Sequence, residues 1–193
     1  SGRRVAEFPV GQKGADWGRI RVKGDLLIGT VFQQVDADPQ KVPVARRLLV
    51  GQKVPLKILA LNRHTGEQVW SHEATSSFPV VSVGTDRIYC FDGALQSFYK
   101  DWKRRGLIPK ASDRRKLVAI DLASGKVAWE KDAYIIGTWL AYSGGKDVVL
   151  LSNKENIVAF DGRTGDELWK QYSEGVGFRG HPESLWDRII VWN

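Results

Sequence analysis

The residues best suited to metal binding or nucleophilic chemistry are few and widely separated. The chain of 193 residues has three histidines, His64, His72 and His181, and one cysteine, Cys90. The histidine spacings match no metal or haem motif, and one cysteine builds neither an internal disulfide nor a multi-cysteine metal site. Cys90 lies among apolar residues in DRIYCF, which is typical of a buried side chain. We therefore expect no catalytic residue and no metal site in this chain.

A second group of reactive residues, Asp121, Ser124 and Lys126, lies within the stretch AIDLASGKVAW and could form a polar site. Near copies of this stretch favour a structural role, because they keep the Asn/Asp, the Thr/Ser-Gly pair and the tryptophan but not the lysine. The three copies are ALNRHTGEQVW (60–70), AIDLASGKVAW (119–129) and AFDGRTGDELW (159–169).

Each copy has the pattern of a β-hairpin, since apolar or alternating segments flank a glycine-containing turn. The glycine takes a positive φ that closes a bulged hairpin, and the side chain of the Asn or Asp accepts backbone N–H groups. The turn residues are Asn62 with Gly66, Asp121 with Gly125, and Asp161 with Gly165. The repeated tryptophans are Trp70, Trp129 and Trp169, which are 59 and 40 positions apart.

Another pair of strand-like segments precedes each hairpin, at 18–31, 79–91 and 138–152. Four antiparallel strands in about 40 residues form one blade of a β-propeller. We therefore predict an all-β fold of four-stranded blades at 17–76, 77–134 and 135–174, with the repeated tryptophans and glycines docking neighbouring blades. Residues 1–10 are expected to form the outer strand of a preceding blade, and 178–193 the inner strands of a truncated one.

Three to four blades fall short of a closed ring. Unstacked blades would expose sheet faces and unpaired edges. We therefore expect the remaining blades to come from a longer parent chain, a partner subunit or self-association.

The pattern A-[LIF]-[ND]-x-x-[TS]-G-x-x-x-W resembles the tryptophan-docking repeat of the bacterial pyrroloquinoline-quinone (PQQ)-like, or quinoprotein alcohol dehydrogenase-like, β-propellers. The resemblance covers essentially the whole chain, with three good copies and a degenerate one at 1–6, where Ala6 stands in the tryptophan position. Family members include alcohol and glucose dehydrogenases and the lipoprotein scaffold of outer-membrane protein assembly. The resemblance implies a periplasmic or cell-surface location.

Two functions are open for a member of this family. The dehydrogenases hold PQQ with calcium and typically carry an adjacent cysteine pair at the cofactor, whereas Cys90 is alone. The resemblance therefore favours a non-catalytic binding or assembly scaffold with no cofactor in this chain. The alternative is a fragment of a PQQ-dependent oxidoreductase.

The net charge of +7 is concentrated in two segments, 33–57 and 92–116. Both interrupt the link between second and third strands of adjacent blades, so they are expected to lie side by side at one end. In the second, Leu95, Phe98, Tyr99 and Trp102 have helical spacing beside several cations. This predicts either a basic docking face for an acidic protein or an anionic surface, or a helix packed on its own propeller with a solvated charged side.

The docking hypothesis names ten residues: Arg46, Arg47, Lys100, Trp102, Lys103, Arg104, Arg105, Arg114, Arg115 and Lys116. Nucleic acid ranks below a protein partner, because the chain outside the two segments is slightly acidic.

A further candidate site lies on the propeller axis, where the innermost strands begin. An aromatic floor with a cation would suit a flat anionic cofactor or an acidic peptide, although inner-strand aromatics also commonly fill the tapered core. The candidates are Trp17, Arg19, Trp139, Arg179 and His181. No apolar run of about 18 residues exists, so we expect no transmembrane helix.

Overall fold

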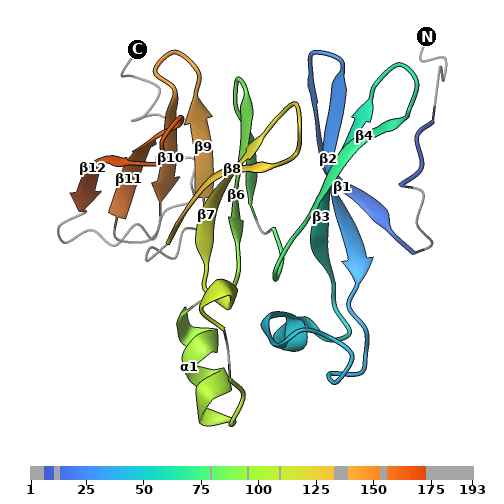
Figure 1. Ribbon diagram of the computed structural model, residues 1–193, viewed down its shortest axis with the longest axis vertical. Coiled ribbons are helices and arrows are strands. Elements are labelled where there is room, and N and C mark those ends of the chain that lie inside the picture. Colours follow the sequence, from blue (N-terminus) through green and yellow to red (C-terminus); the bar gives the residue numbers. More distant parts are fainter. Residues whose placement is uncertain are drawn as a thin grey trace.

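The computed structural model describes residues 7–10, 14–78, 80–94, 96–108, 110–132, 139–152 and 156–172. These residues form three four-stranded antiparallel sheets that follow one another along the chain (Figure 1). The first sheet contains β1 (Asp16–Lys23), β2 (Leu26–Gln34), β3 (Lys53–Asn62) and β4 (Gln68–Glu73). The second contains β5 (Val81–Val83), β6 (Arg87–Asp92), β7 (Lys116–Asp121) and β8 (Val127–Asp132). The third contains β9 (Trp139–Ser143), β10 (Val148–Ser152), β11 (Asn156–Asp161) and β12 (Glu167–Tyr172).

Each sheet keeps its strands in chain order, with β1, β5 and β9 at one edge and β4, β8 and β12 at the other. Sequential antiparallel strands repeated in this way are the blades of a β-propeller. The predicted all-β fold is therefore confirmed, and the chain supplies part of a larger ring.

The sheets bury apolar side chains on both faces because their central strands are apolar at nearly every position. In β6, Ile88 and Cys90 pack toward the first sheet, whereas Tyr89 and Phe91 pack toward the third. All four are fully buried. Alternate residues of a strand point to opposite faces, so an uninterrupted apolar run fills two interfaces at once.

The three repeated hairpins share one turn geometry. Gly66, Gly125 and Gly165 have φ values of +79°, +70° and +72°, which a residue with a side chain adopts only with strain. The side chain of Asp161 accepts the backbone N–H groups of Arg163 and Thr164 at 2.8 and 2.9 Å, and Asn62 and Asp121 make equivalent bonds. This confirms the predicted turn chemistry.

Two insertions lie at the end of the sheets opposite these hairpins (Figure 1). The first joins β2 to β3 and contains the 3₁₀ helix η1 (Val44–Leu49). The second joins β6 to β7 and contains α1 (Gln96–Arg104) and the 3₁₀ turn η2 (Ala111–Asp113). The first is shorter than the predicted 33–57, because β2 continues to Gln34 and β3 begins at Lys53. β3 accommodates Pro55 beside a register shift, where a proline does not break the ladder.

Candidate functional site

The repeated tryptophans join each blade to the hairpin turn of the next. Trp70, on β4, packs so closely on Gly125 that a methyl group there would lie 2.6 Å from the indole ring. The Trp70 indole N–H also donates to the carbonyl of Leu122 at 2.9 Å. Trp129, on β8, lies against Gly165 in the same way and donates to the carbonyl of Gly162 at 3.0 Å. The carbonyl acceptor precedes the glycine by three residues in both cases.

The corresponding turn of the first sheet receives a phenylalanine. The ring of Phe8 lies where a side chain on Gly66 would have to be. The repeat pattern predicts Ala6 in this position, and Ala6 lies outside the described residues. Among the described residues the side chain that packs on Gly66 is that of Phe8, two positions later. Phenylalanine has no N–H to donate, and the Phe8 carbonyl instead accepts the indole N–H of Trp17 at 2.8 Å.

The third repeated tryptophan differs in exposure. Trp169, on β12, is 48% exposed, whereas Trp70 is 7% exposed. The large apolar side chain of Trp169 is thus available for a further contact of the same kind.

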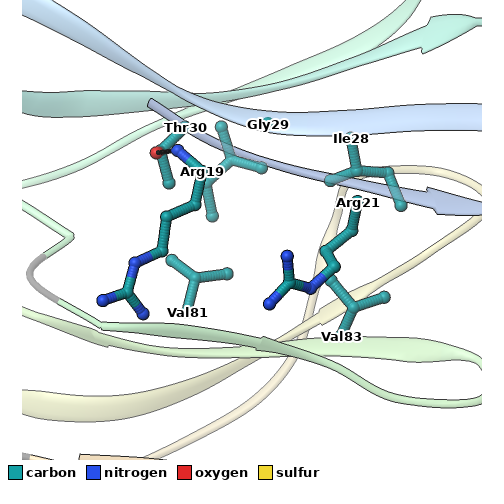
Figure 2. Close-up of a pocket in the computed structure, with 8 residues that line it drawn as sticks. Arg19, Arg21, Ile28, Gly29, Thr30, Val81 and Val83 are labelled. Carbon is teal, nitrogen blue, oxygen red and sulfur yellow. Dashed lines mark hydrogen bonds between the residues drawn. The ribbon is translucent and has the colours of Figure 1, made fainter. Parts of the chain in front are cut away.

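A small pocket lies between the innermost strands of the first two blades (Figure 2). Arg19 and Arg21 of β1 extend across it toward Val81 and Val83 of β5. The rest of its lining consists of Ile28, Gly29, Thr30 and Ile58. The backbone N–H of Arg19 donates to the Thr30 hydroxyl at 3.1 Å, which fixes β1 on β2 at this point.

The predicted axial residues are only partly brought together. Trp17 packs with Val31 and Leu59, on the face of the first sheet away from β5, so it is not a floor beneath Arg19. The reason is a bulge: the register of β1 with β2 shifts between Trp17 and Ile20, which breaks the alternation that would have put Trp17 and Arg19 on one face. Gly18 inside the strand was the signal for this bulge.

The other axial candidates do not complete this pocket among the described residues. Trp139 begins β9 and is half-buried. Arg179 and His181 lie outside the described residues. Arg21, which sequence reasoning missed, lies two positions from Arg19 and lines the same pocket.

The two insertions share a small apolar core of their own. Trp102 of α1 is 1% exposed and packs with Ala45 of η1 and with Ala94. Val44, Leu48 and Leu107 surround this group. The prediction that Trp102 contributes to a partner-binding face is therefore wrong, because its ring is buried between the insertions.

Several of the predicted basic residues also have structural contacts. The Arg115 guanidinium lies 4.6 Å from the centre of the Phe91 ring, and burial lowers the pKa of Arg115. Arg46 donates to the backbone carbonyls of Ala74 and Thr75, which fixes η1 to the segment after β4. Lys116 pairs with Glu130 at 2.5 Å, and Arg47 is half-buried. Arg46 and Arg115 therefore hold parts of the insertions in place, Lys116 is paired within the second sheet, and all four side chains are partly buried.

Two buried carboxylates fix nearby backbone, one in the link between β4 and β5 and one inside the second insertion. Asp92, at the end of β6, accepts the backbone N–H groups of Thr75 and Ser76 at 2.8 and 3.1 Å. Asp113 accepts the backbone N–H of Lys110 at 2.8 Å. Carboxylates that accept such bonds restrain a loop strongly, since leaving them unpaired in a buried place is costly.

The surface that remains exposed on α1 and the segment after it is basic with apolar residues between the charges. Phe98 is 39% exposed and Ile108 is 87% exposed. Arg104 and Arg105 both pair with Asp101, at 2.5 and 2.9 Å, and keep most of their side chains in solvent. We define the loop face by its exposed residues: Phe98, Lys100, Lys103, Arg104, Arg105, Ile108, Lys110 and Arg114.

The described residues contain neither a metal-binding cluster nor a membrane-spanning helix. Within the ranges given above, no group of three or more His, Cys, Asp or Glu side chains is placed to hold a metal ion. In the same part of the chain, no helix has the length and apolarity needed to cross a membrane.

Comparison with known proteins gives a match to one family over most of the chain. The family model described as "Outer membrane protein assembly factor BamB" matches residues 57–192. The outer membrane protein assembly factor BamB of Kangiella koreensis is 31% identical over 123 residues, which make up 64% of this chain and 29% of that protein. The chain therefore spans under a third of the length of this curated relative.

Solved structures resemble the chain more distantly. BamB from Moraxella catarrhalis has a TM-score of 0.47 at 11% identity, over 82% of this chain and 35% of that one. A europium-containing methanol dehydrogenase has a TM-score of 0.49 at 13% identity, over 80% and 31%. The β-propeller domain of the trilobed protease from Pyrococcus furiosus has a TM-score of 0.49 at 11% identity, over 83% and 44%. Scores below 0.5 support no functional assignment.

Proposed function

This chain belongs to the BamB-like family of PQQ-repeat β-propellers, and on that premise we propose that it is part of a non-catalytic scaffold that binds another protein in the bacterial envelope. The family match over 57–192 carries the proposal, because the matched relative is named as an assembly factor. The proposed location is the periplasm or cell surface, and the proposed partner is a protein, with nucleic acid ranked below it.

The loop face is the proposed docking surface for an acidic partner. Arg104, Arg105 and Arg114 supply charge, while Phe98 and Ile108 supply apolar area between the charges. Arginine with large apolar side chains is a typical composition for the centre of a protein interface. The shared core around Trp102 supports the proposal, since it holds this surface on two blades at once.

The matched experiment compares two triple variants of equal charge. The first carries Arg104→Ser, Arg105→Ser and Arg114→Ser at the loop face. The control carries Arg63→Ser, Lys126→Ser and Arg163→Ser in the three hairpin turns at the opposite end. A photo-crosslinker at Lys103 of the full-length protein identifies the partner by mass spectrometry, and the affinity is then measured with that purified partner.

The loop-face variant is expected to weaken partner binding at least about tenfold, because charged hydrogen bonds are lost. Its free energy of unfolding should change by less than about 1 kcal/mol, as for ordinary surface residues. The control should retain affinity. Equal affinity of both triple variants would remove the loop face from the proposal.

The alternative function, a fragment of a quinoprotein dehydrogenase, needs PQQ and calcium. The chain has no adjacent cysteine pair for such a site: Cys90 is alone and fully buried, with its thiol 3.8 Å from the carbonyl of Val118. We propose that the chain binds no cofactor. Addition of PQQ with calcium to the full-length protein should leave its absorbance spectrum and its thermal midpoint unchanged. Tight binding would favour the dehydrogenase instead.

A further inference from the structure

The pocket between β1 and β5 presents two arginines from one strand, Arg19 within the bulge of β1 and Arg21 just beyond it. Arg19 and Arg21 line it from the same strand, and both guanidinium groups extend toward β5 (Figure 2). Two residues along a strand span about 6.7 Å. Apart from these two, every residue that lines the pocket is uncharged. The positive charges therefore lie over apolar and neutral surface.

These two arginines have no acidic partner, unlike four other arginines of the described chain. Among the described residues, no carboxylate forms an ion pair with Arg19 or Arg21. By contrast, other arginines pair with an aspartate at 2.5–3.9 Å, namely Arg63, Arg87, Arg104 and Arg105. A guanidinium presents a planar set of N–H donors that matches a carboxylate. The pocket thus holds two such donor sets whose charge the described residues do not neutralise.

We propose that this pocket binds an extended acidic segment of a partner protein, with carboxylates at two alternate positions. In an extended segment, alternate side chains point to one side and repeat at the same spacing of about 6.7 Å as Arg19 and Arg21. β1 is an edge strand of its sheet, so a segment can lie along it. The residue between the two acids points away from the arginines and is not selected.

The spacing separates this occupant from other anions. A compact anion such as phosphate would have to draw both guanidinium groups together to engage them, whereas two alternate carboxylates meet one guanidinium each. Two adjacent acidic residues of an extended segment point to opposite sides, so only one of them reaches an arginine. The pocket therefore favours a segment whose acidic residues lie at alternate positions over one of the same charge whose acidic residues are adjacent.

The first test uses the unaltered full chain and two peptides of equal composition, both acetylated and amidated at their ends. The peptide Thr-Glu-Thr-Glu-Thr has alternate acids, and Thr-Glu-Glu-Thr-Thr has adjacent acids. Isothermal titration at low salt should show the alternate peptide binding at least about fivefold more tightly, with affinity falling as salt is added. Equal affinity for the two peptides would overturn the proposal, and so would tight binding of PQQ with no binding of either peptide.

The second test uses variants with a matched control. Arg19→Ser and Arg21→Ser should each weaken binding of the alternate peptide at least about tenfold. Arg163→Ser removes the same charge from an exposed hairpin turn and should leave binding unchanged. Equal weakening in all three variants would show only general attraction to a basic protein. Circular dichroism checks folding, and the peptide comparison on the unaltered chain does not depend on any variant.

The pocket is separate from the loop face, so the two proposals can fail independently. The triple variant at Arg104, Arg105 and Arg114 should bind the alternate peptide normally. Loss of partner binding in that variant with retention of peptide binding would support both proposals, whereas loss of peptide binding would contradict this one.

Discussion

The two junctions between consecutive blades are built differently. The first and second blades are joined at both ends, by Trp70 on the hairpin turn containing Gly125 and by the insertion core around Trp102. The second and third blades share the equivalent hairpin contact, Trp129 on Gly165. The connection between β10 and β11 has only three residues, so the third blade offers no insertion to match. The comparison indicates that the repeated contact stacks blades, whereas the insertions reinforce one junction.

The largest effect is expected for Trp129→Ala, which removes the indole side chain that joins the second blade to the third. Loss of this packing should lower the free energy of unfolding by about 3–5 kcal/mol, measured by chemical denaturation. Hydrogen exchange should speed up mainly in β9–β12. The same change at half-exposed Trp169 serves as control and should cost less. A neutral result for Trp129→Ala would contradict the docking role of the repeated tryptophan.

Trp102→Ala tests the reinforcement of the first junction. A cavity in the insertion core should cost about 3 kcal/mol, at the lower end of the range for a buried tryptophan because the core is small. Exchange should rise in η1 and α1 together, since both insertions contribute to one core. If only α1 responds, the insertions do not join the blades.

Gly125→Ala, compared with Gly24→Ala, distinguishes two costs to stability: overpacking between the blades and strain in the backbone. Gly125 and Gly24 both have positive φ, +70° and +56°, but only Gly125 faces a tryptophan ring. Both alanine variants should lose about 1–2 kcal/mol from the backbone conformation. Gly125→Ala should lose about 1–3 kcal/mol more through overpacking against Trp70. Equal losses would show that the ring moves aside without cost.

The smallest expected effect is on the loss of thermal stability at low pH, to which the hairpin turn containing Asp121 contributes. Hydrogen bonds from the Ser124 hydroxyl and backbone N–H lower the pKa of Asp121. The folded state thus gains stability above the usual aspartate pKa of about 3.9, and loses it as the pH falls toward the lowered value. Asp121→Asn keeps an oxygen acceptor, as Asn62 does in the first blade. The variant should show a smaller drop in thermal midpoint between pH 7 and pH 3.

The control for this measurement is Asp132→Asn, at an exposed position that ends β8. Its drop in thermal midpoint should match that of the unaltered chain. An unchanged drop in Asp121→Asn would show that the turn carboxylate contributes nothing to the acid sensitivity.

The repeated parts of the fold were predictable from the sequence because each contact depends on local spacing. The Asn/Asp, the glycine and the tryptophan of each hairpin lie within nine residues, so turn chemistry and strand period fix their geometry. The positions of the two insertions at one end followed from strand connectivity alone.

The candidate sites were less predictable because they depend on contacts across long stretches of chain. The burial of Trp102 depends on Ala45, which lies 57 residues earlier, so helical spacing could not show which way the ring turns. The separation of Trp17 from Arg19 depends on a bulge that reverses the expected face. Arg21 could have been added, since it follows Arg19 at the strand period.

The docking contact has a direction, and this sets how blades can be gained or lost. The outer strand of each blade contributes an aromatic side chain that packs on the next blade. The hairpin turn of each blade in turn contacts the aromatic side chain of the blade before it. Such a head-to-tail contact joins copies in series and closes into a ring only when their rotations sum to a full circle. A blade that carries both halves of the contact can therefore be duplicated or removed during evolution without redesign of its neighbours, and the blade count is limited by closure of the ring.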